Sequence, residues 1–329
     1  MIIFLIACVL LTAWPILRVS QGLYEDHTQM IALQGARPPL VVARGLARLS
    51  LWVQAQYQQT PVAIRVFNLW LGVLVALAVG WLAHGLGLTS WPAIGVMLLH
   101  PLRTETMAQM SGRYELIAAL GVVLACVCVA RTRVTGWHLL GALSWLGLGW
   151  LGKETALVGV PLVALTLWTM QARGLGRRFG GRLVATTILV LIVAAVSQRH
   201  LGWTNAIHGL HAQDWFLVQS TAAWRLLTML IMPQHQTVDF DYDSLGLAIR
   251  IGAMMGLMCS VVGLCVLWRM QRMLAYAVAW PLVTILPRLI IQTPKSYLNE
   301  HQMFLGLVGI ALAVAYGHAR LEAWCSVNV

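Results

Sequence analysis

Residues 99–115 read "LHPLRTETMAQMSGRYE" and lie between two apolar runs, "WPAIGVML" (91–98) and "LIAALGVVLACVCVA" (116–130). The polar stretch holds two arginines, two glutamates, a histidine and a proline, whereas the runs beside it hold no charged residue. Apolar runs of this kind recur along the chain, and many windows approach the roughly 20 apolar residues that cross the core of a bilayer. We therefore expect the stretch at a membrane surface, between two membrane-spanning helices.

The composition of the whole chain supports this interpretation. Of its 329 residues, 59% are hydrophobic and only 10% are charged, whereas a soluble domain carries about 25% charged residues. Only helices or closed barrels satisfy the backbone polar groups in lipid, and the apolar runs lack the alternation of a barrel strand. The sequence therefore predicts an all-α, polytopic integral membrane protein, folded as a single transmembrane domain over residues 1–329.

The hydropathy pattern predicts about ten spans. They are 2–17, which is expected to be retained rather than cleaved as a signal peptide, and 64–86, 88–101, 114–130, 136–151, 154–170, 183–198, 246–267, 274–291 and 303–318. Three longer outer loops are expected at about 18–63, 199–245 and 289–302, and the apolar segment 221–233 is too short to cross. Within the first loop, Arg44 and Arg48 are four residues apart, and Leu46, Leu49, Trp52 and Val53 are available for an apolar face. This pattern predicts an amphipathic helix in the membrane interface, which either walls a lateral opening for a lipid or anchors the loop.

The charged residues predict the orientation of the chain. The net charge is +11, but the arginines are scattered at span ends, as orientation signals are, so no nucleic-acid partner is expected. With both termini in the cytoplasm, ten of the eleven acids and both lysines fall on the outer side, and Glu322 alone falls inside. The six cysteines lie in predicted spans or in the tail and are expected as small apolar residues rather than as disulfides or a zinc site.

Chemistry is therefore expected on the outer face. The adjacent Glu25 and Asp26 could share a proton, which raises one pKa and produces a general base. Pro101 interrupts a helix beside ionisable residues, and such breaks line protein-buried or wet cavities; alternatively, Arg103 with Glu105 and Arg113 with Glu115 form mutual salt bridges. Further candidates are Lys153 and Glu154 in "LGKET", and Arg288, Lys295, Asn299, Glu300 and His301 before the last span. Asp239, Asp241 and Asp243 are weak candidates for a metal site, because the rest of an EF-hand loop is missing.

In combination these segments resemble the membrane part of a GT-C glycosyltransferase. They are most similar to the transmembrane-and-tetratricopeptide (TMTC-type) O-mannosyltransferases and their bacterial relatives, over residues 20–318 and without a tetratricopeptide tail. The family's H-P-x-x-T-E…(S/V)-G-R-x-(D/E)-L pattern is matched by His100, Pro101, Thr104, Glu105, Ser111, Gly112, Arg113, Glu115 and Leu116. Shorter matches are Tyr24, Glu25 and Asp26; Gly152, Lys153 and Glu154; Pro233 with Asp241, Tyr242 and Asp243; and Asn299, Glu300 and His301. The chain departs from the family at Gln302, Phe304 and Gly306.

The resemblance implies transfer of a sugar from a polyprenyl-phosphate carrier to a hydroxyl acceptor, on a protein or a glycan, at the outer face. Asp26 with Glu25 would take the acceptor proton in one inverting displacement, and Glu105 would be a second acid at the sugar or the partner that orients Arg113. Arg113, Lys153, Arg288, Lys295 and His301 would neutralise the departing phosphate. His100, Thr104, Glu115, Glu154, Asn299 and Glu300 would shape and orient the pocket. No metal or other cofactor is required, and the expected location is a bacterial inner membrane with the site facing the periplasm.

Two other functions fit the same pattern. A transporter or flippase of a lipid-linked substrate would also bind an anionic amphiphile, although transporter sites usually lie near the midplane of the membrane. A non-catalytic membrane subunit derived from such an enzyme, working with a partner membrane chain, is the third hypothesis.

Overall fold

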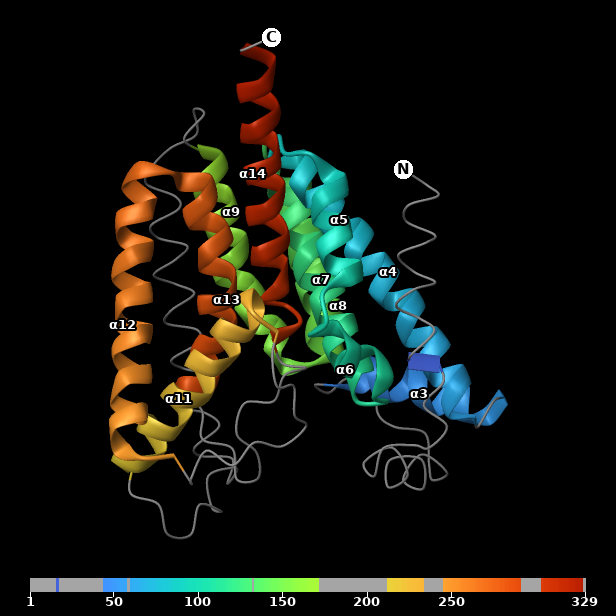
Figure 1. The fold of residues 1–329 in the computed structure, drawn as a ribbon. Helices are drawn as coiled ribbons and strands as arrows, with labels where there is room; N and C mark the ends of the chain where they lie inside the picture. Colours follow the sequence, from blue (N-terminus) through green and yellow to red (C-terminus); the bar gives the residue numbers. More distant parts are fainter. Residues whose placement is uncertain are drawn as a thin grey trace.

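The computed structural model describes residues 16–17, 44–57, 60–131, 133–171, 212–233, 245–290 and 303–327, and this part of the chain is all-α, without a β-strand. Figure 1 shows the helices side by side in a bundle. They are α3 (Gly45–Tyr57), α4 (Pro61–Gly85), α5 (Ser90–Leu99), α6 (Arg103–Ala108), α7 (Gly112–Val129), α8 (Gly136–Gly152), the 3-10 turn η1 (Glu154–Val158), α9 (Gly159–Gln171), α11 (Ala212–Ile231), α12 (Leu247–Met270), α13 (Arg272–Ile290) and α14 (Leu307–Val327).

Three of the described helices are long and apolar enough to cross a membrane. They comprise Val62–Gly85, Gly112–Val129 and Leu247–Met270, and shorter apolar helices comprise Ser90–Leu99, Glu154–Met170, Phe216–Ile231 and Arg272–Leu286. The predicted all-α class is therefore confirmed for the described residues, and the apolar helices are compatible with an integral membrane protein.

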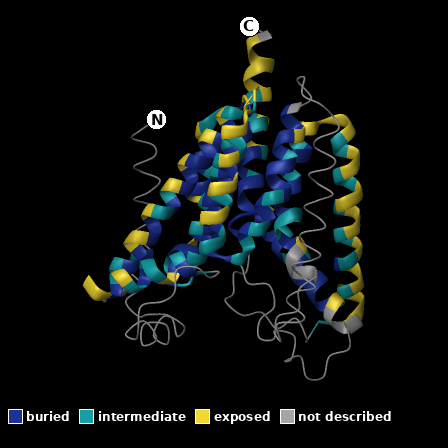
Figure 2. Cartoon of the chain, turned by 180° about the vertical axis from the view of Figure 1, so that it is seen from behind, coloured by how far each residue is buried: buried dark blue, intermediate teal, exposed yellow. Residues whose placement is uncertain are grey.

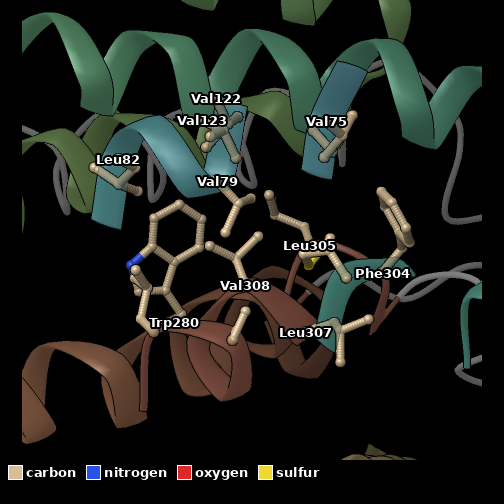
Figure 3. Close-up of a cluster of buried hydrophobic side chains, with 14 of the residues drawn as sticks. Val75, Val79, Leu82, Val122, Val123, Trp280, Phe304, Leu305, Leu307 and Val308 are labelled. Atoms are coloured by element: carbon tan, nitrogen blue, oxygen red, sulfur yellow. The ribbon is translucent and has the colours of Figure 1, made fainter. Parts of the chain in front are cut away.

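The core of the bundle joins helices that are far apart in the sequence. Figure 3 shows Val75, Val79 and Leu82 of α4 facing Trp280 of α13 and Val308 of α14, with Val122 and Val123 of α7 beside them. In contrast, α12 packs mainly along α11 and α13 within the described residues, with Trp268 against Trp168 of α9, and leaves most of its apolar surface exposed (Figure 2). Among the described helices, burial is therefore concentrated in α4, α5, α7, α9, α11, α13 and α14.

Short sequence signals define several helix ends. Thr60 caps α4 by accepting a hydrogen bond from Ala63 N, and Pro61 follows it in the first turn, where a missing N–H costs nothing. Helix α5 ends at Leu99, one residue before the His100–Pro101 pair, and the backbone at His100 is extended, as expected for a residue before proline. The predicted interruption of this helix at Pro101 is therefore confirmed.

The described connections fall at two opposite ends of the bundle. One end holds α3, α6, η1 and the first turns of α4 and α7, and we call it the charged end; it lies at the bottom of Figure 1. The opposite end holds the α4–α5 turn and the end of α14, which are joined by a 3.0 Å hydrogen bond from Thr89 Oγ1 to Glu322 Oε2. Glu105, Glu115 and Glu154 are at the charged end and Glu322 is at the opposite end, as the predicted separation of acids requires.

Several predicted boundaries and faces need correction. Helix α11 begins at Ala212 and has 20 residues, so the segment predicted as 221–233 is longer than expected, and residues 199–245 are not a loop throughout. Helix α14 continues to Val327 rather than ending at 318. Helix α3 is present as predicted, but it buries Ala47, Leu51 and Ala55, whereas Val53 of the predicted apolar face is 42% exposed.

Candidate functional site

Polar and charged side chains are buried together at the charged end. Eight of them are Arg65, Asn68, Arg103, Thr106, Gln109, Arg113, Glu115 and Lys153, each at most 6% exposed. Burying such groups is costly unless they are paired or hydrogen-bonded. The arrangement of their partners therefore indicates what this end of the molecule is built to hold.

His100 joins two helices where α5 ends. Its Nε2 lies 3.1 Å from the carbonyl oxygen of Leu230 in α11, and its Nδ1 accepts a 3.3 Å hydrogen bond from Leu102 N. These contacts fit the neutral imidazole with its proton on Nε2. Burial lowers the pKa of His100, against the smaller opposing effect of the Leu230 carbonyl, which also favours the neutral ring.

The connection between α6 and α7 is closed too tightly for a side chain at Gly112. A Cβ atom there would lie 1.8 Å from the carbonyl oxygen of Thr106, far inside van der Waals contact. In the same connection, Gln109 Nε2 donates to Glu105 Oε1 at 2.9 Å, and Ser111 Oγ donates to Gln109 Oε1 at 3.2 Å. The glycine of the "SGR" motif therefore has a steric cause, and Gln109 is held between two motif side chains.

Arg113 is fully buried in the first turn of α7 and is held by neutral groups. Its Nε donates to Asn68 Oδ1 at 3.1 Å, and its Nη2 donates to Gln54 Oε1 of α3 and to the carbonyl oxygen of Ile64. Its guanidinium carbon lies 4.4 Å from the centroid of the Phe67 ring, within the range of a cation–π contact. The side chains that orient Arg113 are therefore amides, and Glu105 is not its partner.

Asn68 extends this arrangement across three elements. Besides accepting from Arg113, it donates from Nδ2 to the carbonyl oxygen of Gln109 at 2.8 Å and to that of Met107 at 3.5 Å. One buried side chain of α4 thereby fixes both the α6–α7 connection and the guanidinium. Arg65, one helical turn earlier, donates to the carbonyl oxygen of Ala108 at 3.3 Å.

Lys153 and Glu115 form a buried ion pair between α8 and α7. Lys153 Nζ donates to Glu115 Oε1, and Thr155 Oγ1 donates to Glu115 Oε2 at 3.2 Å. The side chains are 8% and 6% exposed. The alternative in which Arg113 pairs with Glu115 is wrong, because residues two apart on a helix do not face each other.

Arg44 and Glu154 form a second, partly exposed ion pair that joins the start of α3 to η1. Arg44 Nε donates to Glu154 Oε2 at 2.8 Å, and Arg44 Nη2 donates to Oε1. Burial opposes ionisation of Glu154, but the hydrogen bond and charge of Arg44 outweigh it and lower the pKa of the carboxyl to about 2. Arg44 also has a φ of 68°, a left-handed conformation that is strained for a residue with a Cβ. The ion pair with Glu154 therefore has to compensate for this backbone strain.

The described site residues thus lie together at one end of the bundle, but they differ in how far they are exposed. Glu105, Arg113, Glu115, Lys153 and Glu154 all lie at the charged end, where Glu105 is half-buried and Thr104 is exposed. The remaining predicted residues lie outside the described residues: Glu25, Asp26, Asp239, Asp241, Asp243, Lys295, Asn299, Glu300 and His301. For Arg288 the structure describes the helix, α13, but not the side chain.

Sequence analysis did not single out Asn68, Arg65 or Gln54. The first two lie in a segment that reads as an ordinary apolar span, and Gln54 lies in the predicted interface helix. Arg65 and Asn68 are three residues apart and therefore share a helix face, which is a signal that could have identified them. Their partners could not be identified in this way, because the α6–α7 connection approaches that face only in the folded bundle.

The comparisons with known proteins leave the chain without an identified relative. No family model matches it, and no curated protein and no solved structure matches it significantly. The sequence motifs and the geometry of the charged end are therefore what point to a function.

Proposed function

We propose that the protein is a membrane glycosyltransferase that moves a sugar from a polyprenyl-phosphate donor to a hydroxyl acceptor. The observation that carries this proposal is the convergence of two separate motif segments, 100–116 and 152–154, at one end of the bundle. Their side chains meet as Lys153 with Glu115, which joins the two segments directly. Segments that match one family's pattern and also lie together in space favour a shared site over independent surface loops.

The proposed reaction is a single inverting displacement. The acceptor oxygen forms a bond to the anomeric carbon of the sugar while the bond from that carbon to the phosphate oxygen breaks, and the polyprenyl phosphate departs. Asp26, assisted by Glu25, takes the proton of the acceptor hydroxyl, and Glu105 contacts the sugar. Arg113 neutralises charge on the departing phosphate, together with Arg288, Lys295 and His301.

Lys153 has a more indirect part in this scheme than Arg113. Its ammonium is already paired with Glu115 and is almost fully buried. Lys153 therefore does not bind the phosphate directly, and Glu115 partly neutralises the positive charge that it places near the phosphate. We propose the same supporting part for Glu154, which positions α3 through Arg44. His100, with both ring nitrogens occupied, orients the end of α5.

The proposal includes an arrangement of the chain in the membrane. About ten spans form a GT-C-like bundle in a bacterial inner membrane, with the charged end in the periplasm and both termini in the cytoplasm. The acceptor, a protein or a glycan, approaches from the periplasm, and no metal takes part in the scheme. A partner membrane subunit could supply part of the acceptor site.

The experiment is a transfer assay with the purified chain in liposomes. A polyprenyl-phosphate-linked hexose with a labelled sugar is supplied, and label is followed into hydroxyl acceptors and into released polyprenyl phosphate. Asp26→Asn is expected to reduce transfer by about 100-fold or more, since general base catalysis contributes roughly that much. Glu322→Gln, a carboxylate change at the opposite end, is the matched control and is expected to transfer at the normal rate.

Two results would contradict the proposal. Transport of the intact lipid-linked sugar without transfer would favour a flippase. Binding of the donor with neither transfer nor transport, in protein that folds normally, would favour a non-catalytic subunit.

A further inference from the structure

Arg113 is a buried cation with no buried anion beside it. Its side chain is 0% exposed, and its partners are the amide oxygens of Asn68 and Gln54, the carbonyl oxygen of Ile64 and the ring of Phe67. Its Nη1 atom is buried and makes no hydrogen bond. Within the part of the chain that the structure describes, no carboxylate pairs with it.

Two neighbouring cations differ from Arg113 in that each is paired with a carboxylate. Lys153 is paired with Glu115, and Arg44 is paired with Glu154, so each has its own carboxylate at the same end of the bundle. An uncompensated buried charge is strongly destabilising. The cost is increased at Arg113 because the first turn of α7 is the positive end of the helix dipole, where an anion is favoured and a cation is not.

We propose that Gln54 of α3 holds the place of a phosphate group on the buried guanidinium of Arg113, and that the phosphate enters this anion site when the Gln54 amide is displaced. A guanidinium binds phosphate through two parallel N–H donors. Nη1 is free for one of these bonds, and Nη2 becomes available for the other when the Gln54 amide gives way. The identity of the anion as the phosphate of a lipid rests on the proposed function; the anion site itself does not.

Helix α3 is suited to such an exchange because Leu51, in its middle, packs against the bundle through a small apolar cluster. Leu51 packs with Ile64 and Met110 in a small cluster separate from the main core, with Tyr114 beside it. The polar contacts from α3 and the residue before it to the bundle include Gln54 with Arg113 and Arg44 with Glu154. A rotation of the Gln54 side chain frees Nη2 without breaking the Arg44 pair. Asn68 meanwhile keeps the guanidinium oriented through Nε.

The binding experiment uses the full chain in detergent micelles and follows thermal unfolding by the fluorescence of its 15 tryptophans. The probe is farnesyl phosphate, and farnesol and inorganic phosphate are the comparison compounds. A ligand that binds only the folded state raises Tm, and we expect farnesyl phosphate to raise it by about 2 °C or more, with no effect of farnesol. An equal response to inorganic phosphate would support the anion site with free phosphate as its source, and no response to either phosphate would overturn the proposal.

Two substitutions connect this response to Arg113. Gln54→Glu places a carboxylate where the amide lies, so we expect a higher Tm without ligand and no further rise with farnesyl phosphate. Gln54→Ala removes the amide without adding charge and is expected to keep the response or enlarge it. Arg113→Gln is expected to lose it. A lower Tm for Gln54→Glu, or an undiminished response in it, would overturn the proposal even if Arg113→Gln fails to fold.

The chain's own acids are the competing source of the missing anion. If Asp26→Asn lowers Tm, and Arg113→Gln removes that effect, the first loop supplies the counter-ion and the proposed phosphate site is wrong. The inference and the proposed function can fail separately. Phosphate binding that depends on Arg113 and is abolished by Gln54→Glu, without sugar transfer, contradicts only the function, whereas transfer that needs Arg113 while Gln54→Glu keeps an undiminished Tm response contradicts only the inference.

Discussion

The buried pair of Lys153 and Glu115 is the residue-scale feature whose removal should cost most. Replacing Lys153 by Met removes the ammonium from the buried carboxylate of Glu115, and breaking such a pair costs about 3–5 kcal/mol. We expect Lys153→Met to unfold at a much lower denaturant concentration than the natural chain, and the double variant with Glu115→Gln to recover most of the loss. Unfolding in mixed micelles measures this. Equal stability of the single and double variants would contradict the pairing.

The pair of Arg44 and Glu154 should make stability depend on pH. The folded state holds the pKa of Glu154 at about 2, below its ordinary value of 4.5, so the pair stabilises the folded state fully above pH 4.5. This contribution is lost as the pH falls through the interval from 4.5 towards 2. We expect the Tm difference between the natural chain and Glu154→Gln to be constant from pH 6 to pH 5 and to shrink below pH 4.5.

The matched control for this titration is Glu322→Gln. Glu322 is the exposed carboxylate of α14, 57% exposed in its side chain, beside His318. Its replacement is expected to leave the Tm profile over the same pH interval close to that of the natural chain. If the Tm difference between the natural chain and Glu154→Gln stayed the same down to pH 3, Arg44 would not stabilise the ionised carboxyl.

At the residue scale, sequence reasoning identified the residues better than their partners. It predicted that Arg113, Glu115, Lys153 and Glu154 belong together, and the structure brings all four to one end. It could not determine that Glu115 faces Lys153, because that depends on the rotation of α7 against α8. Asn68 was missed because a single amide in an apolar span changes the mean hydropathy very little.

At the scale of helices, the close approach of α7 and α8 gives a sharp test. A Cβ at Gly121 would lie 2.6 Å from the carbonyl oxygen of Trp145 and 2.7 Å from Cα of Gly149, so Gly121→Ala forces the two helices apart. Overpacking of this kind costs about 1–3 kcal/mol, and we expect a lower Tm. The control is Gly147→Ala, because nothing lies within 4 Å of a Cβ there and alanine favours the helix by about 0.5–1 kcal/mol. Equal effects of the two substitutions would contradict the observed packing.

A helix boundary could be predicted from the sequence where a local residue determines it. The end of α5 was predictable, since Pro101 cannot donate a backbone hydrogen bond and restricts His100. The start of α11 was not, because its first half contains polar residues, including Gln219 and Ser220, that read as loop but are buried in the bundle. The buried face of α3 was also predicted wrongly. Its alanines, Ala47 and Ala55, carry little hydropathy signal but permit close packing.

For the whole molecule, the predicted division of charge between two ends is the property that connects fold and function. Glu105, Glu115 and Glu154 lie at the charged end, and the Thr89–Glu322 hydrogen bond lies at the other end. Sequence alone predicted this division because apolar helices force polar connections to the ends of a bundle. It could not predict how α4, α13 and α14 share one core, since no local pattern encodes contacts between such distant segments.

The division of ends leads to a prediction about orientation. Thr104 is exposed at the charged end, and Cys325 is exposed near the end of α14, which lies at the opposite end of the bundle in Figure 1. If the charged end faces the periplasm, a membrane-impermeant maleimide added to intact cells should label Thr104→Cys in a Cys325→Ser background. The natural Cys325 should react only after the inner membrane is opened. In intact cells the maleimide should therefore label one of the two positions and not the other, because they lie at opposite ends of the bundle. Labelling of Cys325 alone in intact cells would invert the orientation and remove the charged end from the side where periplasmic acceptors are found, whereas labelling of both positions from one side would contradict a membrane-spanning bundle.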